Sequence, residues 1–404
     1  MSTAPNGLRE VVVTHALRTP IGKYLGSFAD LSAADLGASV VTDLLDRASA
    51  AGLDRERVGE LVLGNARQAG GGPNVARQVG VRSGLPKSVP AYTVNMACAS
   101  GLKAVALATE GIRIGRTDVA VAGGTESMSG LPYLLPRMRS GYRLGHAEVV
   151  DAMYKDGFLC PLANMLMGET AERLAQELEV SRAEQDRFAL ASQKKAAAAQ
   201  TSGRFDAELS PVTVKGRRGD TVVDSDEHVR ADATAESLAK LLPVFAARNG
   251  TVTPGNASGI TDGAAALLLM ARETAEELGL EALATIGEHA EVGLDPARMG
   301  LGPVPACNAL AERNGLALDD YDLIELNEAF AAQVLACHRM LPFPLERVNV
   351  NGGAIALGHP IGATGARLCV TLLHEMNKRG SATGLATLCV SGGLGFATAF
   401  HREN

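Results

Sequence analysis

The residue best placed to act as a nucleophile is Cys98, in VNMACASG at residues 94–101. It follows a short apolar run, and the pattern behind it predicts a helix from Ser100 to about Gly115. Peptide dipoles and free N–H groups at a helix N-terminus favour an anion, so we expect a lowered thiol pKa and a nucleophilic thiolate. The alternative, which composition alone favours, is a small buried core residue.

A nucleophilic thiol needs a base, and His359 in the glycine-rich segment NGGAIALGHPIGATG is the candidate. Pro360 suits the first position of a helix. A histidine at a helix N-terminus is disfavoured as a cation, so His359 is expected to stay neutral and accept a proton. The alternative is a histidine whose hydrogen bonds are satisfied within the turn. So many glycines in one loop predict backbone close to a ligand or another chain.

Two more positions carry chemistry at the ends of apolar runs. Cys389 ends ATLCV and precedes SGGLG, and alone it would be read as a core residue. Asn327 and Glu328 follow DLIEL, where they could orient a water or a substrate carbonyl. Asn327 alternatively caps the following helix. The remaining cysteines have no comparable setting: Cys307, Cys337 and Cys369 fall in helical patterns, and Cys160 in FLCPLANM could line a lid.

The elements that must position these residues alternate between strand and helix. Buried strands are predicted at 10–14, 59–65, 89–97 and 118–127, with helices at 33–51 and from residue 100. This alternation predicts an α/β sheet covered on both faces.

The middle of the chain is different. From about Ser127 to Gly255 it is irregular, and one helix is well marked by a capping box of Ser181 and Glu184 and an end at Gly203. This segment is expected to be an insertion or lid. Residues 253–279 are read as a glycine-rich entry into a helix, and a second α/β half follows, ending in two strands around a Ser-Gly-Gly turn.

Composition limits the classes of function. The chain has 404 residues and a net charge of -7, so neither nucleic acid nor a membrane is an expected partner. The six cysteines stand far apart without a CxxC pair, which predicts neither a zinc site nor a disulfide framework. The N-terminus lacks a basic-then-apolar signal region, and a cytoplasmic location is expected.

Taken together, these segments resemble the thiolase family over nearly the whole chain. The motifs are VNMACASG, GGTESMS, GNASGITDGAA, NEAFAAQ, GGAIALGHPIGATGAR and a late cysteine before a glycine-rich turn. The resemblance implies a layered α-β-α-β-α fold of two similar α/β halves, each with a five-stranded mixed sheet, and an inserted loop domain. The implied division is 1–127 plus 261–282, then 128–260, then 283–404.

The resemblance also implies a role for each reactive residue. Cys98 would be acylated by an acyl-CoA, and His359 would take its proton. Cys389 would remove the α-proton of a second acetyl-CoA. Asn327, through a bound water, and His359 would form one oxyanion hole. The backbone N–H groups of Cys98 and Ser391 would form the other, and the kinetics would be ping-pong.

The implied activity is that of an acetyl-CoA C-acetyltransferase, which condenses two acetyl-CoA into acetoacetyl-CoA and CoA. Coenzyme A and acetyl-CoA would be substrate and product, with no tightly bound cofactor and no metal, in a homodimer or homotetramer. The alternative is a 3-ketoacyl-CoA thiolase for longer or functionalised chains. A decarboxylating condensing enzyme and a silent acyl-CoA-binding protein fit less well, because both cysteines and the histidine are present. Implied CoA and acyl contacts are Met167, Arg230, Ser237, Leu241, Ser258, Met299 and Phe330.

Two positions depart from the family pattern. Ser391 stands where glycine is frequent, so its N–H can donate only if the backbone there does not need a positive φ. Leu166 stands where acetoacetyl-type members often carry a histidine, which removes a polar partner for the pantetheine arm.

Overall fold

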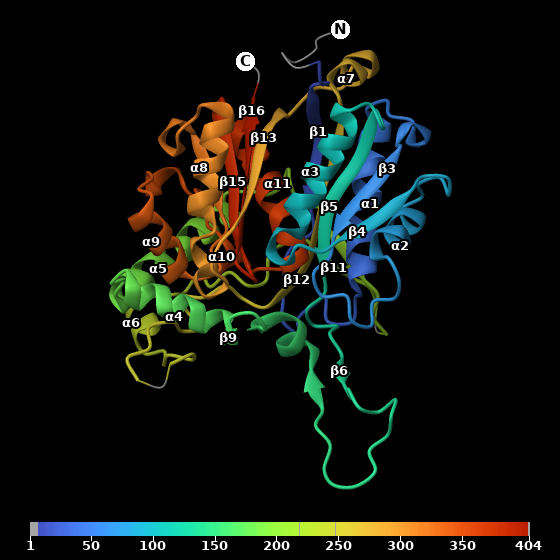
Figure 1. Ribbon diagram of the computed structural model, residues 1–404. Coiled ribbons are helices and arrows are strands. Elements are labelled where there is room, and N and C mark those ends of the chain that lie inside the picture. The colour runs from blue at the N-terminus through green and yellow to red at the C-terminus, as the bar shows by residue number, and fades with distance from the viewer. Residues whose placement is uncertain (1–6, 218, 247, 403–404) are drawn as a thin grey trace.

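A mixed ten-stranded sheet forms the centre of the molecule (Figure 1). The computed structural model describes residues 7–217, 219–246 and 248–402. The N-terminal half of the sheet has the order β4-β3-β5-β12-β1. Its strands are β1 (Val11–Arg18), β3 (Glu60–Gly64), β4 (Ala91–Val94), β5 (Val119–Glu126) and β12 (Thr261–Ala271), with β2 (Gly22–Lys23) paired to β12.

The C-terminal half repeats this arrangement in the order β14-β15-β16-β13. Its strands are β13 (Ala284–Gly293), β14 (Leu323–Leu326), β15 (Thr383–Val390) and β16 (Leu394–His401). A single parallel bridge from Val348 to Ile324 takes the place of β4. Chain order and the sense of each pairing match between the halves, so they are structural repeats.

The predicted fold class is therefore confirmed, with two differences in detail. The second half has four strands and a bridge where five strands were expected, because the chain turns at Asn349 (φ 44°) directly after Val348. The two halves also join into one sheet, through two residue pairs between β1 and β13.

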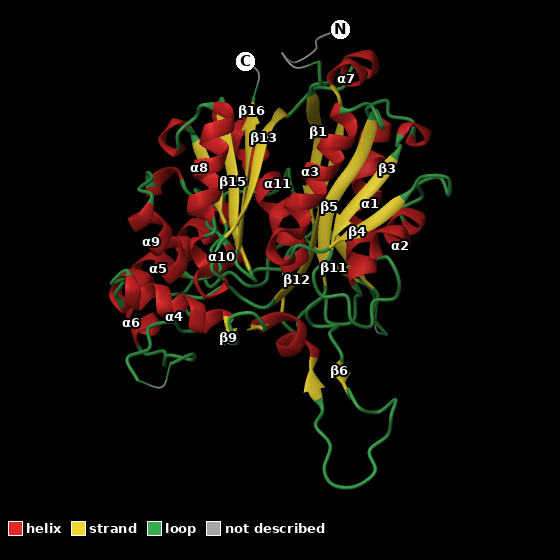
Figure 2. Ribbon diagram, viewed as in Figure 1, coloured by secondary structure: helices red, strands yellow, loops and turns green. Residues whose placement is uncertain are grey.

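Helices form layers on both sides of each half-sheet. Between the halves lie α3 (Ser100–Arg113) and α11 (Ile361–Arg379), whose apolar side chains share one core with β5, β12, β15 and β16. The outer faces are covered by α1 (Ala33–Ala50), α2 (Val75–Arg82), α8 (Pro303–Asn314) and α9 (Ala331–Met340). Figure 2 shows the resulting order of helix, sheet, helix, sheet and helix.

The prediction of a helix entry at 253–279 is wrong for most of its length. Residues Thr261–Ala271 form strand β12, and only Arg272–Leu278 are helical, as α7. The run AAALLLM has good helix propensity. It lies between β1 and β5, however, and all eleven residues of the strand are buried, so pairing on both edges and packing on both faces override local propensity.

The segment 128–260 adds no strand to the ten-stranded sheet in its described residues. It contains three two-stranded pieces and the helices α4 (Met167–Glu177), α5 (Arg182–Thr201) and α6 (Ala235–Ala239), which gather at one end of the sheet (Figure 1). The capping box of Ser181 and Glu184 is present, and Gly203 adopts φ +68° just past α5. The domain boundaries themselves stay a prediction.

All six cysteines are free thiols. Within the described ranges, no helix has the length and apolarity to cross a membrane. Nor do those ranges hold a cluster of three or more His, Cys, Asp or Glu side chains suited to a metal ion.

Close backbone contacts hold α11 against β5. A Cβ on Gly124 would lie 2.1 Å from the carbonyl oxygen of Gly362, and neither backbone can swing away as a side chain would. We expect Gly124→Ala to lower the free energy of unfolding by about 1–3 kcal/mol, measured by denaturant titration. Gly293→Ala is the matched control, because its Cβ would meet nothing closer than 3.8 Å. Equal stability of the two variants would contradict this close contact.

Candidate active site

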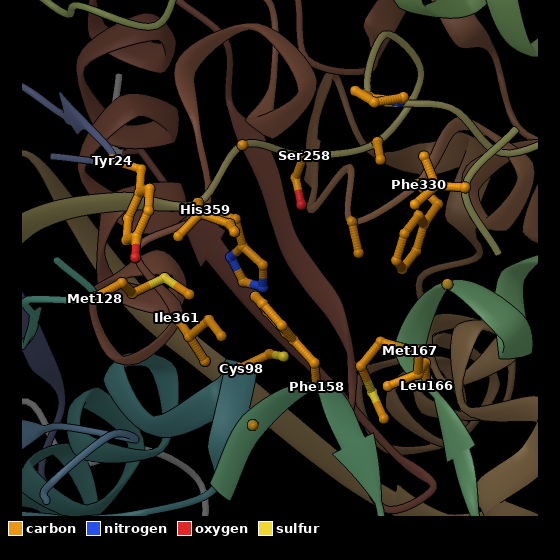
Figure 3. A pocket seen from close by; sticks show the side chains of 18 of the residues that line it. Tyr24, Cys98, Met128, Phe158, Leu166, Met167, Ser258, Phe330, His359 and Ile361 are labelled. Carbon is orange, nitrogen blue, oxygen red and sulfur yellow. The ribbon is translucent and has the colours of Figure 1, made fainter. Parts of the chain in front are cut away.

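One cavity of about 650 Å³ collects most of the predicted reactive residues. Cys98, His359, Cys389 and Ser391 all line it. Figure 3 shows the side chains of Cys98 and His359 pointing into the same space, with Phe158 beside them and Phe330 across it.

The repeated fold explains why these residues meet. Cys98 lies just before Ala99, the N-cap of α3, and His359 lies just before Pro360, the N-cap of α11; these are equivalent helices of the two halves. The helices approach closely near their N-termini, since a Cβ on Gly101 would lie 2.8 Å from the backbone nitrogen of Ala366. Two residues 261 positions apart in the chain are therefore placed at one end of a single helix pair.

The backbone before Cys98 is strained. Ala97 has φ 45°, a left-handed conformation that costs a residue with a Cβ about 1 kcal/mol or more. Ser100 holds this turn, because its Oγ donates to the carbonyl of Ala97 (2.7 Å) and accepts from the N–H of Met96 (2.9 Å). The turn presents Cys98 to the cavity. It does not direct Cys98 into the core, the position that composition alone favoured.

The expectation of a lowered thiol pKa at Cys98 is wrong. Burial raises the pKa of Cys98 above its usual value, and the N–H of Ser391, the positive charge of Arg67 and the N–H of Cys98 itself offset this only in part. Removal of the thiolate from water outweighs the helix N-terminus. The resting nucleophile is a neutral thiol.

His359 is buried, and its neighbours determine which ring nitrogen carries the proton. Thr364 Oγ1 lies 2.6 Å from Nδ1 and donates to the carbonyl of Pro360 (3.0 Å), so it accepts from Nδ1–H. Nε2 is then the unprotonated nitrogen. Burial lowers the pKa of His359 to about 3, with the positive charges of Arg367 and Arg67 acting in the same direction. His359 is therefore neutral at rest, as the sequence predicted, and its role as a base stays a prediction.

These two shifts predict how Cys98 alkylation depends on pH. Because the thiol pKa is raised, the thiolate fraction rises through pH 7 to 9 without a plateau. The neutral imidazole adds no step there, since its pKa of about 3 lies far below. We expect inactivation by iodoacetamide to accelerate throughout this range, with the label on the Cys98 peptide. A plateau below pH 7 would show a lowered thiol pKa.

Cys389 ends β15 and is buried next to Met299 and Phe330. Burial, and then the neighbouring Cys98, raise its pKa well above the usual value. Ser391 follows it and is not among the described residues with positive φ, whereas Gly392 and Gly393 have φ of 90° and 85°. Serine at 391 therefore carries no backbone penalty, and its N–H is directed at the Cys98 sulfur.

Asn327 lies behind the cavity wall. Its Nδ2 is 3.5 Å from Nε2 of His359, and its Oδ1 is buried without a hydrogen-bond partner in the described chain. An unpartnered buried amide oxygen suits a bound water. The helix-cap alternative is wrong, because Phe330 holds the N-cap position of α9. Glu328 instead bonds Ser192, Asn349 and the N–H of Ile355, away from the cavity.

Five of the seven predicted CoA and acyl contacts line the cavity, as does Leu166. They are Met167, Arg230, Ser258, Met299 and Phe330. Ser237 is exposed on α6 with its hydroxyl bonded to the carbonyl of Thr234, and Leu241 packs near α6; neither is part of the wall. Their contacts with CoA stay a prediction.

Sequence reasoning missed several residues of the site. Arg67 and His228 line the cavity, and Glu126 anchors the loop behind it. Glu126 accepts four N–H bonds, from the side chain of Asn65 and from the backbones of 66, 67 and 362, while burial raises its pKa to about 7. A basic residue directly after a buried strand, as in LVLGNAR, was the available signal for Arg67.

The fold and the cavity define a class of α/β protein built from two copies of one unit, with a thiol and an imidazole at the paired helix ends. Family models for the thiolase N-terminal domain and the thiolase C-terminal domain match residues 11–273 and 280–402. The chain therefore belongs to the thiolase family.

Three relatives show how close the similarity is. The chain is 51% identical over 398 residues to an acetyl-CoA acetyltransferase of Escherichia coli K12, covering 98% of this chain and all of the relative. The solved acetyl-CoA acetyltransferase of Bacillus anthracis matches at TM-score 0.95 and 43% identity, covering 98% and 99% of the two chains. Human mitochondrial 3-ketoacyl-CoA thiolase matches at TM-score 0.93 and 39% identity, covering 98% and 99%.

Proposed function

We propose that this protein is an acetyl-CoA C-acetyltransferase, which joins two acetyl-CoA into acetoacetyl-CoA and CoA and also runs in reverse. The main support for this proposal is one cavity lined by the thiols of Cys98 and Cys389 and by the neutral imidazole of His359. Acetyl-CoA acetyltransferases about 50% identical over nearly the full chain support it.

In the first half-reaction, Cys98 attacks the thioester carbon while its proton passes to Nε2 of His359. The transfer accompanies attack, because a thiol with a raised pKa and an imidazole with a pKa of about 3 do not form an ion pair at rest. The N–H groups of Cys98 and Ser391 hold the oxyanion. CoA leaves with the proton, and an acetyl thioester remains on Cys98.

In the second half-reaction, Cys389 removes the α-proton of another acetyl-CoA. While Cys98 is acetylated its sulfur cannot ionise, so Cys389 can lose its proton without the like charge that, after burial, raises its pKa. His359 and a water on Asn327 hold the enolate oxygen, in line with the unpartnered Oδ1 of Asn327. The enolate carbon attacks the acetyl carbon, the bond from that carbon to the Cys98 sulfur breaks, and the α-proton taken by Cys389 passes to the Cys98 sulfur.

Coenzyme A would enter over the segment 128–260, past Arg230, Ser258 and Met167, with Met299 and Phe330 near the acyl group. Ser237 and Leu241 belong to this proposal as outer contacts. A homodimer or homotetramer in the cytoplasm, without nucleic acid or membrane partners, completes it.

The second candidate is a 3-ketoacyl-CoA thiolase for longer chains, and Leu166 favours it. This apolar side chain lines the cavity, so it offers nothing to hold a small polar substrate in place. Thiolysis rates on acetoacetyl-CoA and on six- and eight-carbon 3-ketoacyl-CoAs separate the two. We expect acetoacetyl-CoA to be the best substrate of the three, and a strong preference for the longer, uncharged chains would favour the second candidate.

A further inference from the structure

A buried cation without a hydrogen-bond partner among the described residues lies in the wall of the catalytic cavity. Arg67 is only 8% exposed, yet its side chain makes no ion pair or hydrogen bond within the described residues, and its Nε is buried and unpartnered. The carboxylate of Glu126 attracts this cation without bonding it, and a buried guanidinium that makes no hydrogen bond still loses the water it had in the unfolded chain. A ligand carboxylate that accepted its N–H groups would offset this cost.

The loop that carries Arg67 is held in place by other groups. Glu126 accepts the N–H groups of Ala66 and Arg67, and all of its contacts come from N–H donors other than the guanidinium. Gly157 lies against the guanidinium, since a Cβ there would be 2.6 Å from Nε of Arg67. The position is thus shaped around an arginine whose side-chain N–H donors make no hydrogen bond within the described residues.

The anion cannot be a phosphate of CoA while the thioester lies at Cys98. Ala66, next to Arg67, packs in an apolar cluster with Met128, Phe158 and Cys98, at the inner end of the cavity. The pantetheine arm keeps the phosphates away from this end. Exposed cations suited to them lie elsewhere on the wall, at Lys23 and Arg230.

The space near Arg67 exceeds what an acetyl group fills. A second cavity of about 630 Å³ shares Gly157, Met167 and Ser391 with the first, and the neighbours of Arg67 in sequence, Ala66 and Gln68, line it. Arg67 lines the same cavity as Cys98 and His359, and its positive charge lowers the pKa of both groups.

We propose that Arg67 is a specificity determinant that pairs with a carboxylate at the far end of the acyl group held on Cys98. Its planar fork of N–H donors fits two carboxylate oxygens. The inference rests on the proposed function in using the same Cys98 chemistry, and it widens the substrates to 3-oxoacyl-CoAs that end in a carboxylate.

The reaction balances in the direction of thiolysis. The Cys98 sulfur bonds to the 3-oxo carbon, the bond between C2 and C3 breaks, and C2 takes a proton from Cys389 to give acetyl-CoA. The thiol of free CoA gives its proton to Cys389, and its sulfur displaces Cys98 to release a CoA thioester that ends in a carboxylate. The proton that His359 took from Cys98 in the first step returns to the Cys98 sulfur. Arg67 would hold that carboxylate through both steps.

Two substrates that differ only at the chain end provide the test: 3-oxohexanedioyl-CoA, with a carboxylate, and 3-oxohexanoyl-CoA, with a methyl group. For the natural sequence we expect kcat/KM to favour the carboxylate substrate by about 10-fold or more. Arg67→Met should lower this ratio roughly 10- to 100-fold, and Arg67→Lys should lower it less. The ratio is taken within one enzyme, so loss of folded protein or of Cys98 reactivity cancels.

A preference of the natural sequence for the uncharged chain, or an unchanged ratio in Arg67→Met, would overturn the proposal. If that variant does not fold, the natural sequence and Arg67→Lys decide. The rate of acetoacetyl-CoA thiolysis is measured in the same variants, and it tests the proposed function independently of the role of Arg67. If no substrate turns over, a second measurement tests the proposal: acylation of Cys98 by succinyl-CoA and by butyryl-CoA, monitored by mass spectrometry. Faster succinylation supports the role of Arg67, and faster butyrylation opposes it.

Discussion

Replacing Cys98 with alanine is expected to abolish both half-reactions, with a fall in kcat of about 10⁴-fold or more. Among the described residues of the cavity wall, the one other cysteine is Cys389, whose pKa is raised well above the usual value, so it is a poor alternative site for the covalent intermediate. Stability should change little, since Cys98 lies at the cavity surface and is only partly buried.

The measurement is the mass of the protein after brief mixing with acetyl-CoA, followed by peptide mapping. The natural sequence should gain one acetyl group on the peptide that carries Cys98, and Cys98→Ala should gain none. Cys307→Ala is the matched control, because it removes a buried thiol outside the catalytic cavity and should retain acetylation and turnover. An acetyl group on another residue of Cys98→Ala would show that the nucleophile is misassigned.

The sequence predicted the layered fold because its strands and helices are marked locally. β1, β3 and β5 are short apolar runs, and α1 and α3 carry apolar residues at helical spacing. β12 was missed because AAALLLM also suits a helix, and only its two neighbours in the sheet decide the matter. Strand pairing between residues far apart in the chain is not visible in a local pattern.

The features of the site that are marked locally in the sequence were also predictable, and those that depend on the folded chain were not. The placement of Cys98 and His359 before two helices was predictable, because helix starts are encoded nearby in sequence. The pKa of Cys98 was not, since it depends on how much water the folded cavity excludes. Arg67 was missed for a related reason: an arginine after a strand is ordinary in sequence, and only the folded chain shows that this one is buried in the cavity wall with its Nε lacking a hydrogen bond.

Replacing Cys389 with alanine is expected to separate the two half-reactions. Cys98 keeps its base, because His359 is bonded to Thr364 and Asn327 and not to Cys389. Acetylation of Cys98 should therefore remain within a few-fold of the natural rate. Condensation should fall by about 10²- to 10⁴-fold, the usual contribution of a positioned acid or base, because no other group in the wall replaces the lost sulfur next to Met299 and Phe330.

Rapid mixing with acetyl-CoA, followed by intact mass, would show the acetyl-enzyme accumulating in Cys389→Ala, while acetoacetyl-CoA formation is followed by its absorbance. Cys307→Ala again serves as the control, with both steps preserved. Loss of acetylation together with condensation would mean that Cys389 helps to activate Cys98. Retention of condensation would instead place the removal of the α-proton on another group, and His359 and His228 are the imidazoles that the described wall offers.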